Sequence, residues 1–324
     1  MLYRRCGRSG LLLPAVALGC GRNFGDTGDQ DEIRRMLHRA FDLGITYFDL
    51  ANHYGPPPGG AERNVGRILK EDFAAHRDEL ILSTKAGSPM WPGPYGDWGS
   101  KKYLIASLDQ SLKRLGVEYV DIFYHHRPDP ETPLEETLGA LDQIVRQGKA
   151  LYVGISNYSG AATCESERIL RSLGTPLTVH QPDYSMLLRG VEQELLPHTE
   201  RLGIGVVAYS PLARGLLSDR YLARVQVGDR VLGADGSLRA RQVTPEMLAA
   251  LHSLRDLARE RGQTLAQMAL AWVLRHPRVT TALIGASRVE HLDENLAALD
   301  AAPFTDAELQ HIDAILAPYD ETGI

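Results

Sequence analysis

The sequence predicts an α/β fold, a (β/α)8 TIM barrel that begins with an N-terminal β-hairpin and ends in extra C-terminal helices. Short runs rich in β-branched and aromatic residues alternate with amphipathic helical patterns about every 30 to 40 residues. No long linker or shift in composition divides the chain. Its 324 residues, 44% of them apolar, are enough to bury one large core. We therefore expect residues 1–324 to form a single domain.

The strand elements follow from this alternation. Residues 3 to 18 alternate around Gly10, which predicts the turn of the initial hairpin. Barrel strands are then predicted at Thr46–Leu50, Leu80–Lys85, Tyr119–Tyr124, Leu151–Ile155, Leu177–Gln181, Gly205–Tyr209 and Thr281–Ile284.

Two helix starts carry recognisable capping patterns. Thr132–Glu135 reads as a capping box with Pro133 at the first helical position, and Thr305–Glu308 repeats the pattern for the last helix. The longest segment without a clear period, Ser218 to Val243, is predicted to be an excursion above the barrel.

Composition excludes several classes of function. The chain has 35 Lys and Arg against 41 Asp and Glu, a net charge of −6, and no dense basic stripe for nucleic acid. No apolar run approaches the roughly 20 residues that a membrane span needs. Cys6, Cys20 and Cys164 are an odd number without metal-like or redox-like spacing. Structural thiols in the reducing cytoplasm are the simplest interpretation.

Four kinds of reactive side chain fall at or just after the ends of neighbouring predicted strands. They are Asp49, Tyr54, Lys85 and one of the adjacent pair His125 and His126. Working residues of such barrels lie at this end. Each residue alone has an ordinary structural explanation, but the set has a chemistry. An ammonium beside a phenol favours the ionised phenol, so its pKa falls toward a range useful for protonating a carbonyl oxygen.

These residues resemble the Asp/Tyr/Lys/His tetrad of the aldo-keto reductases, and the resemblance covers essentially the whole chain. It is greatest to the group that contains bacterial L-glyceraldehyde 3-phosphate reductases and the β subunits of voltage-gated potassium channels. The stretches that carry it are Asp49–Gly55, Asp121–Pro128, Phe41–Thr46, Tyr54–Pro58, Trp91–Gly96, Gly148–Gly154, Tyr209–Ala213 and Gly285–Arg288. The family's histidine directly precedes an Arg-Pro pair, which assigns the role to His126, whereas His125 should face the opposite side, into the structure.

The resemblance also implies how a nicotinamide cofactor is held across the strand ends. The nicotinamide amide would bind Ser156, Asn157 and Gln181, and Tyr209 would stack on the ring. Gly21, Arg22 and Asp49 are assigned to the nicotinamide pocket, where close relatives often carry an aromatic residue near position 21. The pyrophosphate would run along Ser210, Pro211, Leu212 and Arg214. A Rossmann site is not predicted, because Gly19–Phe24 lacks the third glycine.

The last predicted strand delivers a serine and an arginine into a helix start. Gly285, Ser287, Arg288 and free N–H groups there are suited to an anion such as the 2′-phosphate of NADP, so NADP(H) is the expected cofactor. His291 also belongs to this site, and the resemblance places Glu294 and Asn295 at the adenine. Many members of the family carry lysine at the position of Gly285 and arginine at that of His291.

The expected substrate is a small aldehyde such as glyceraldehyde 3-phosphate or methylglyoxal, with Tyr54, His126 and Trp91 around it. Trp91 lies with Tyr95 and Trp98 in a Pro/Gly-rich loop that fits a substrate wall and a subunit contact equally well. Relatives form oligomers, so a homo-oligomer is expected. The alternative is a slow-turnover NADP(H)-binding redox sensor, although His126 stands where channel β subunits usually carry asparagine. A metal-dependent enzyme would need ligand clusters that the sequence lacks.

Overall fold

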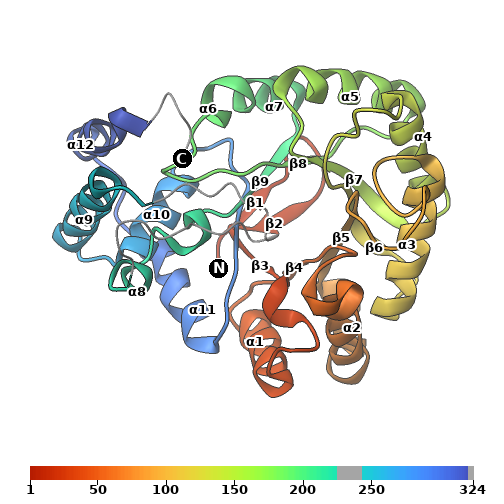
Figure 1. The fold of residues 1–324 in the computed structure, drawn as a ribbon, viewed down its shortest axis with the longest axis horizontal. Coiled ribbons are helices and arrows are strands. Elements are labelled where there is room, and N and C mark those ends of the chain that lie inside the picture. Colours follow the sequence, from red (N-terminus) through yellow and green to blue (C-terminus); the bar gives the residue numbers. More distant parts are fainter. Residues whose placement is uncertain (225–242, 320–324) are drawn as a thin grey trace.

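The computed structural model describes residues 1–224 and 243–319, in which parallel strands close into a barrel surrounded by helices (Figure 1). The barrel strands are β3 (Val16–Gly19), β4 (Tyr47–Asp49), β5 (Ile81–Ala86), β6 (Val120–His125), β7 (Ala150–Ser156), β8 (Val179–Gln181), β9 (Gly205–Tyr209) and β10 (Thr281–Ile284). They follow one another in chain order around the barrel, which closes where β10 pairs with both β9 and β3. The predicted (β/α)8 barrel is confirmed.

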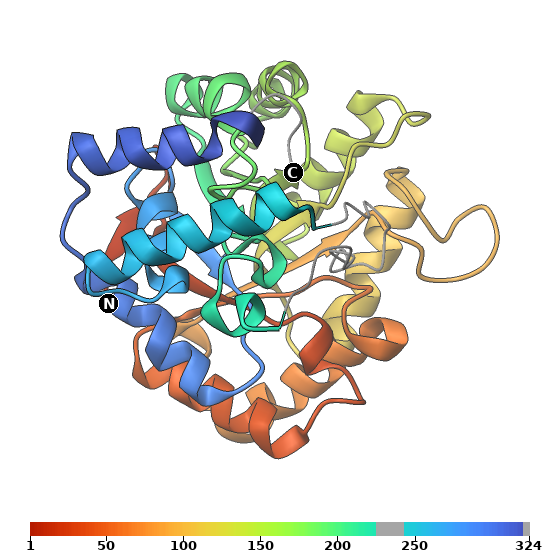
Figure 2. The same ribbon diagram turned by 60° about the vertical axis from the view of Figure 1, so that its left-hand side comes forward.

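The helices form an outer layer. They are α1 (Gln30–Asp42), α2 (Gly60–Asp72), α3 (Lys101–Leu115), α4 (Leu134–Arg146), α5 (Gly160–Leu173), α6 (Val191–Glu194), α7 (Leu196–Leu202), α8 (Asp219–Leu222), α9 (Pro245–Glu260), α10 (Leu265–Leu274), α11 (Val289–Leu296) and α12 (Asp306–Leu316). The last of them, α12, packs against α9 at the edge of the molecule (Figure 2). It corresponds to the C-terminal addition expected from the sequence.

The two predicted capping patterns have different outcomes. Thr305 forms a capping box at the start of α12, because its side chain accepts from the N–H of Glu308 and the Glu308 carboxylate accepts from the N–H of Thr305. The prediction for Thr132 is wrong. Pro133, with φ −53° and ψ 134°, is itself the residue that precedes the helix, and α4 begins at Leu134. Thr132 therefore lies one residue too early to cap it.

The N-terminal hairpin is shorter than predicted. β1 (Tyr3–Arg5) pairs antiparallel with β2 (Leu12–Pro14), but the alternation that continues to residue 18 belongs to the barrel strand β3. The hairpin covers the end of the barrel where strands begin. There Arg4 donates to the carbonyls of Leu274 and Val279, just before β10.

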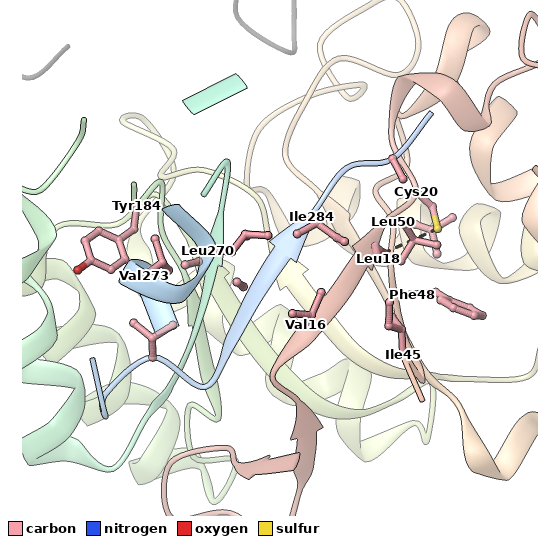
Figure 3. Packing of buried hydrophobic residues seen from close by; sticks show 14 of the residues in the cluster. Val16, Leu18, Cys20, Ile45, Phe48, Leu50, Tyr184, Leu270, Val273 and Ile284 are labelled. Carbon is pink, nitrogen blue, oxygen red and sulfur yellow. Dashed lines mark hydrogen bonds between the residues drawn. The ribbon is translucent and has the colours of Figure 1, made fainter. Parts of the chain in front are cut away.

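Two apolar layers hold the barrel. Alternate residues of each strand face outward onto the helices, and Figure 3 shows part of this layer, including Leu18 of β3 and Ile284 of β10. A smaller cluster fills the inside, with Ala17, Val207 and Leu283 among its members. Most residues of the barrel strands are buried on both faces, which makes these strands rich in apolar residues.

Two further sequence expectations concern the segment predicted above the barrel and the absence of a membrane span. Of the predicted excursion from Ser218 to Val243, residues 225–242 lie outside the described residues, and the first part forms the short helix α8. Among the described residues, no helix has both the length and the apolar composition to cross a membrane.

Candidate active site

The predicted tetrad lies at one end of three adjacent strands. Asp49 ends β4, Lys85 is the penultimate residue of β5, and His126 directly follows β6. Tyr54 sits in the loop after β4. That loop is tied to the barrel because the N–H of Asn52 donates to the carbonyl of Lys85 at 2.9 Å. Carboxyl ends of parallel strands share one rim of the barrel, so residues up to 77 positions apart in the chain meet there.

Lys85 and Asp49 form a fully buried ion pair. The Nζ of Lys85 donates to Oδ2 of Asp49 and to the carbonyl of Leu50, the latter at 2.7 Å, and neither charged side chain has any exposed surface. Burial lowers the pKa of Lys85 because it penalises the ammonium, and Asp49 opposes this shift. The charge on Lys85 therefore depends on Asp49.

Tyr54 and His126 adjoin this ion pair. The Nζ of Lys85 lies 5.1 Å from the centre of the Tyr54 ring, and the rings of Tyr54 and His126 are 5.9 Å apart. His53 contacts both rings, with centroid distances of 4.9 Å to Tyr54 and 5.0 Å to His126. Burial, followed by the nearby Lys85 ammonium, holds the pKa of His126 well below its usual value. At neutral pH this imidazole is uncharged, so it offers one N–H donor to a carbonyl oxygen.

The neighbouring His125 faces the other way, as the two-residue period of a strand requires. Its Nδ1 lies 2.6 Å from the hydroxyl of Tyr158 on the helix side of the barrel. Burial lowers its pKa to about 4. The predicted division between the two histidines agrees with their positions.

The residues assigned to the nicotinamide are joined to the tetrad by hydrogen bonds. Asn157 donates to the carbonyl of His126 at 3.0 Å and accepts from the hydroxyl of Tyr209 at 2.7 Å. Ser156 donates to the carbonyl of Gln181, whose Nε2 donates to Oδ1 of Asp49 at 3.1 Å. The structure thus brings together groups from the ends of β4, β6, β7, β8 and β9. A role for them in cofactor binding stays a prediction.

The backbone at these strand ends adopts unusual conformations. Asn157, Ser210 and Arg214 have φ values of 64°, 52° and 58°, in the left-handed region that non-glycine residues rarely occupy. Such conformations concentrate at functional sites. Arg214, assigned to the pyrophosphate, forms a salt bridge of 3.2 Å with Asp183.

The predicted anion site contains one residue that sequence reasoning missed. Arg220 of α8 donates to Nε2 of His291 at 2.8 Å, and the hydroxyl of Ser287 lies 3.3 Å from the other ring nitrogen. Arg288 precedes α11 directly. The missed arginine lies in the segment without a period, where no strand-end rule applies. Its only signal was a positive charge shortly after the loop assigned to the pyrophosphate.

One part of that prediction is wrong. The first N–H of α11, on Val289, is not available to an anion because it donates to Oε1 of Glu32 at 2.8 Å. The side chains of Arg220, Arg288 and Ser287 remain as candidate groups for a phosphate, and this role stays a prediction. Asn295, assigned to the adenine, is buried, and Glu294 is exposed.

The rim also has open space next to these residues. A Cβ atom added at Gly21 or at Gly285 would meet no atom within 4 Å. These two positions follow β3 and β10, which are adjacent in the barrel. The binding of a dinucleotide cofactor along this part of the rim stays a prediction. Arg22, the other residue assigned to the pocket, is exposed.

The aromatic loop after β5 leaves its two interpretations open. Trp91 packs on Tyr103 of α3 at 5.2 Å, and the guanidinium of Arg127 lies 3.6 Å from the ring centre of Trp98. Arg127 also pairs with Asp97. Figure 2 shows this segment, coloured amber between β5 and α3, projecting from the body of the barrel. The side chain of Tyr95 within it is more than half exposed. Arg127 is thus occupied by the loop itself.

A metal centre finds no support in the described part of the chain. None of its His, Cys, Asp and Glu residues gather in groups of three or more that could hold a metal ion.

Comparison with known proteins gives two kinds of match. The model of the aldo/keto reductase family matches residues 15–317. The L-glyceraldehyde 3-phosphate reductase of Escherichia coli (strain K12) is 55% identical over 323 residues, which cover 98% of this chain and 93% of that protein. The "Probable voltage-gated potassium channel subunit beta" of Arabidopsis thaliana is 34% identical over 326 residues, covering 98% of this chain and 97% of that protein.

Proposed function

The chain belongs to the aldo/keto reductase family, and from this premise we propose that it reduces small aldehydes to alcohols with NADPH. L-glyceraldehyde 3-phosphate and methylglyoxal are the proposed substrates. The observation that carries the proposal is the closeness of Tyr54 to both partners: the Nζ of Lys85, which is paired with Asp49, lies 5.1 Å from the Tyr54 ring, and the His126 ring lies 5.9 Å from it.

Each residue of the tetrad has a task that follows from its surroundings. The neutral imidazole of His126 donates a hydrogen bond to the carbonyl oxygen and orients it. Tyr54 supplies the proton that this oxygen gains, and the Lys85 ammonium stabilises the phenolate left behind. Asp49 keeps Lys85 charged against the penalty of burial. NADPH, when bound, supplies the hydride.

The proposed cofactor contacts follow the chain of hydrogen bonds along the rim. Ser156, Asn157 and Gln181 would hold the nicotinamide amide, since Asn157 is bonded to His126 and Gln181 to Asp49. Arg220 and Arg288 would hold the 2′-phosphate, and their two guanidinium groups would favour NADPH over NADH.

The first test is the initial rate of NADPH oxidation with a panel of small aldehydes, for the native protein and for Tyr54→Phe. The substitution removes the proton donor and keeps the ring, so the rate should fall by about 10²- to 10⁴-fold. Tyr3→Phe, at an exposed position of the N-terminal hairpin, is the matched control and should retain the native rate. Binding of NADPH without turnover of any aldehyde would refute the reductase and favour the redox-sensing alternative.

Two further proposals concern the cellular setting. We propose a homo-oligomer, by resemblance to relatives, and sedimentation of the purified protein would test it. A cytoplasmic location is consistent with three cysteines that form no disulfide.

A further inference from the structure

Three neighbouring strands carry a second polar side chain two positions before a predicted catalytic one. The pairs are Tyr47 and Asp49 on β4, Ser83 and Lys85 on β5, and Tyr124 and His126 after β6. Because side chains alternate along a strand, both members of a pair face the barrel interior. We call Tyr47, Ser83 and Tyr124 the lower tier. All three are fully buried, at a depth where barrels are usually filled by branched apolar residues.

The lower tier converges on one oxygen of Asp49. Ser83 donates to Oδ1 at 2.6 Å, and Tyr47 donates to the same oxygen at 3.3 Å. Gln181 donates to it as well, at 3.1 Å. The other oxygen, Oδ2, accepts from Lys85. One oxygen is thus held by three uncharged donors, which leaves the second one for the ammonium.

The direction of the phenol hydrogen bonds is fixed by the carboxylate. An ionised carboxylate only accepts, so Tyr47 must use its proton on Asp49 and its own oxygen accepts from Tyr124, 2.9 Å away. Burial raises the pKa of both phenols well above the usual value. They stay protonated at working pH, and the chain Tyr124 to Tyr47 to Asp49 is a permanent donor array.

We propose that Ser83, Tyr47 and Tyr124 are positioning residues that fix the Asp49 carboxylate with Oδ2 toward Lys85, and so keep Lys85 charged beside Tyr54. This inference rests on the proposed reductase function. Without the lower tier, Oδ1 of Asp49 keeps only the hydrogen bond from Gln181. The carboxylate is then held less firmly, its contact with Nζ weakens, and burial removes the proton from Lys85 at a lower pH. The reactive state needs a protonated Tyr54 and a charged Lys85 together.

The test is the pH profile of kcat for aldehyde reduction in Ser83→Ala, Tyr47→Phe and the double variant. The limb at high pH should move to lower pH by about half a unit to one unit, more in Ser83→Ala than in Tyr47→Phe because its hydrogen bond is shorter. The dissociation constant for NADPH should change less than twofold. Groups that face Lys85 from the surrounding elements stay unaltered, namely Cys20, Asp49, Tyr54, Glu62, Tyr124 and His126.

Matched controls separate positioning from general loss of packing. Tyr184→Phe removes a buried phenol that donates to Glu192, and Ser166→Ala removes a buried hydroxyl on α5. Both lie away from the tetrad and should leave the pH profile unchanged. The inference would be overturned if the high-pH limb of the kcat profile in the Ser83 and Tyr47 variants lay at the same pH as in the controls, or at a higher pH.

A second measurement needs no turnover. Carbon NMR of ¹³C-lysine-labelled protein, with the Lys85 signal assigned from Lys85→Arg, follows the titration of this side chain directly. Ser83→Ala should lower its apparent pKa relative to the native protein and to Ser166→Ala. An unchanged Lys85 titration refutes the positioning role even if the native protein reduces aldehydes. A native protein without turnover, but with the expected titration shift, refutes only the proposed function.

Discussion

The buried ion pair between Asp49 and Lys85 gives the sharpest expectation for stability. Removing one partner leaves the other as an uncompensated charge in a site with no exposed surface, which typically costs about 3–5 kcal/mol. Asp49→Asn leaves the ammonium and Lys85→Met leaves the carboxylate, so each single variant should lose this amount. Removing both charges leaves none uncompensated. The double variant should therefore be no less stable than either single one.

The size of the effect in a melting experiment follows from the chain length. Unfolding entropy of about 2.1 cal/mol/K per residue gives about 0.7 kcal/mol/K for 324 residues, so each single variant should melt about 4–7 °C lower. Differential scanning calorimetry of the four proteins in the cycle measures it. Asp26→Asn, which breaks an exposed pair with Arg63, is the control and should shift the midpoint by less than about 1.5 °C. Additive losses in the double variant would show that the two charges are not coupled and would refute the reasoning.

Three other expectations concern pH, cofactor choice and a helix cap. Burial lowers the pKa of His125 and of His180 to about 4. In the unfolded chain the pKa of histidine is near 6.5, so between pH 6.5 and 4 the unfolded state binds more protons than the folded state. The free energy of unfolding should therefore fall by about 3 kcal/mol per histidine as the pH drops from 6.5 to 4. In His180→Asn the melting temperature should depend less steeply on pH than in the native protein. Arg220→Gln should weaken NADPH by about tenfold in a fluorescence titration and leave NADH unchanged; equal losses would contradict a 2′-phosphate contact. Thr305→Ala should cost about 1 kcal/mol in calorimetry, and a neutral effect would mean that the end of α12 contributes nothing to cooperative unfolding.

The sequence predicted most of the barrel because its strands are buried on both faces and the helices between them are amphipathic. It misassigned β3, since the alternation of the hairpin runs into that strand without a break. The hairpin and β3 are distinguished by their pairing, since Val16 of β3 pairs with Ala282 of β10. A local sequence pattern cannot show a pairing between residues so far apart in the chain. The capping box at Thr132 failed for a related reason. A local pattern matched, while Pro133 and the start of α4 set the actual boundary.

Candidate site residues were easier to find, because a parallel barrel collects every strand end on one rim. Asp49, Lys85 and His126 could each be placed from a strand and its end. Arg220 could not, because it lies on a short helix in a segment without a period. The lower tier was visible in principle as a repeated two-residue spacing. Recognising it requires knowing which face of each strand is the inner one, and a strand buried on both sides hides this in its sequence.

The interior of the barrel is consequently divided in two. Under the tetrad, β4 to β6 present the hydroxyl groups of Tyr47, Ser83 and Tyr124, whereas β9 and β10 present apolar Val207 and Leu283. Buried hydroxyl groups are costly unless each is hydrogen-bonded, and here each donates toward one carboxylate oxygen or to the phenol that does. The apolar layer between strands and helices supplies the burial that stabilises the fold. The hydroxyl groups of the polar half can therefore stabilise the charged form of Lys85 through Asp49. Apolar side chains at the same positions would offer no hydrogen bonds to that carboxylate.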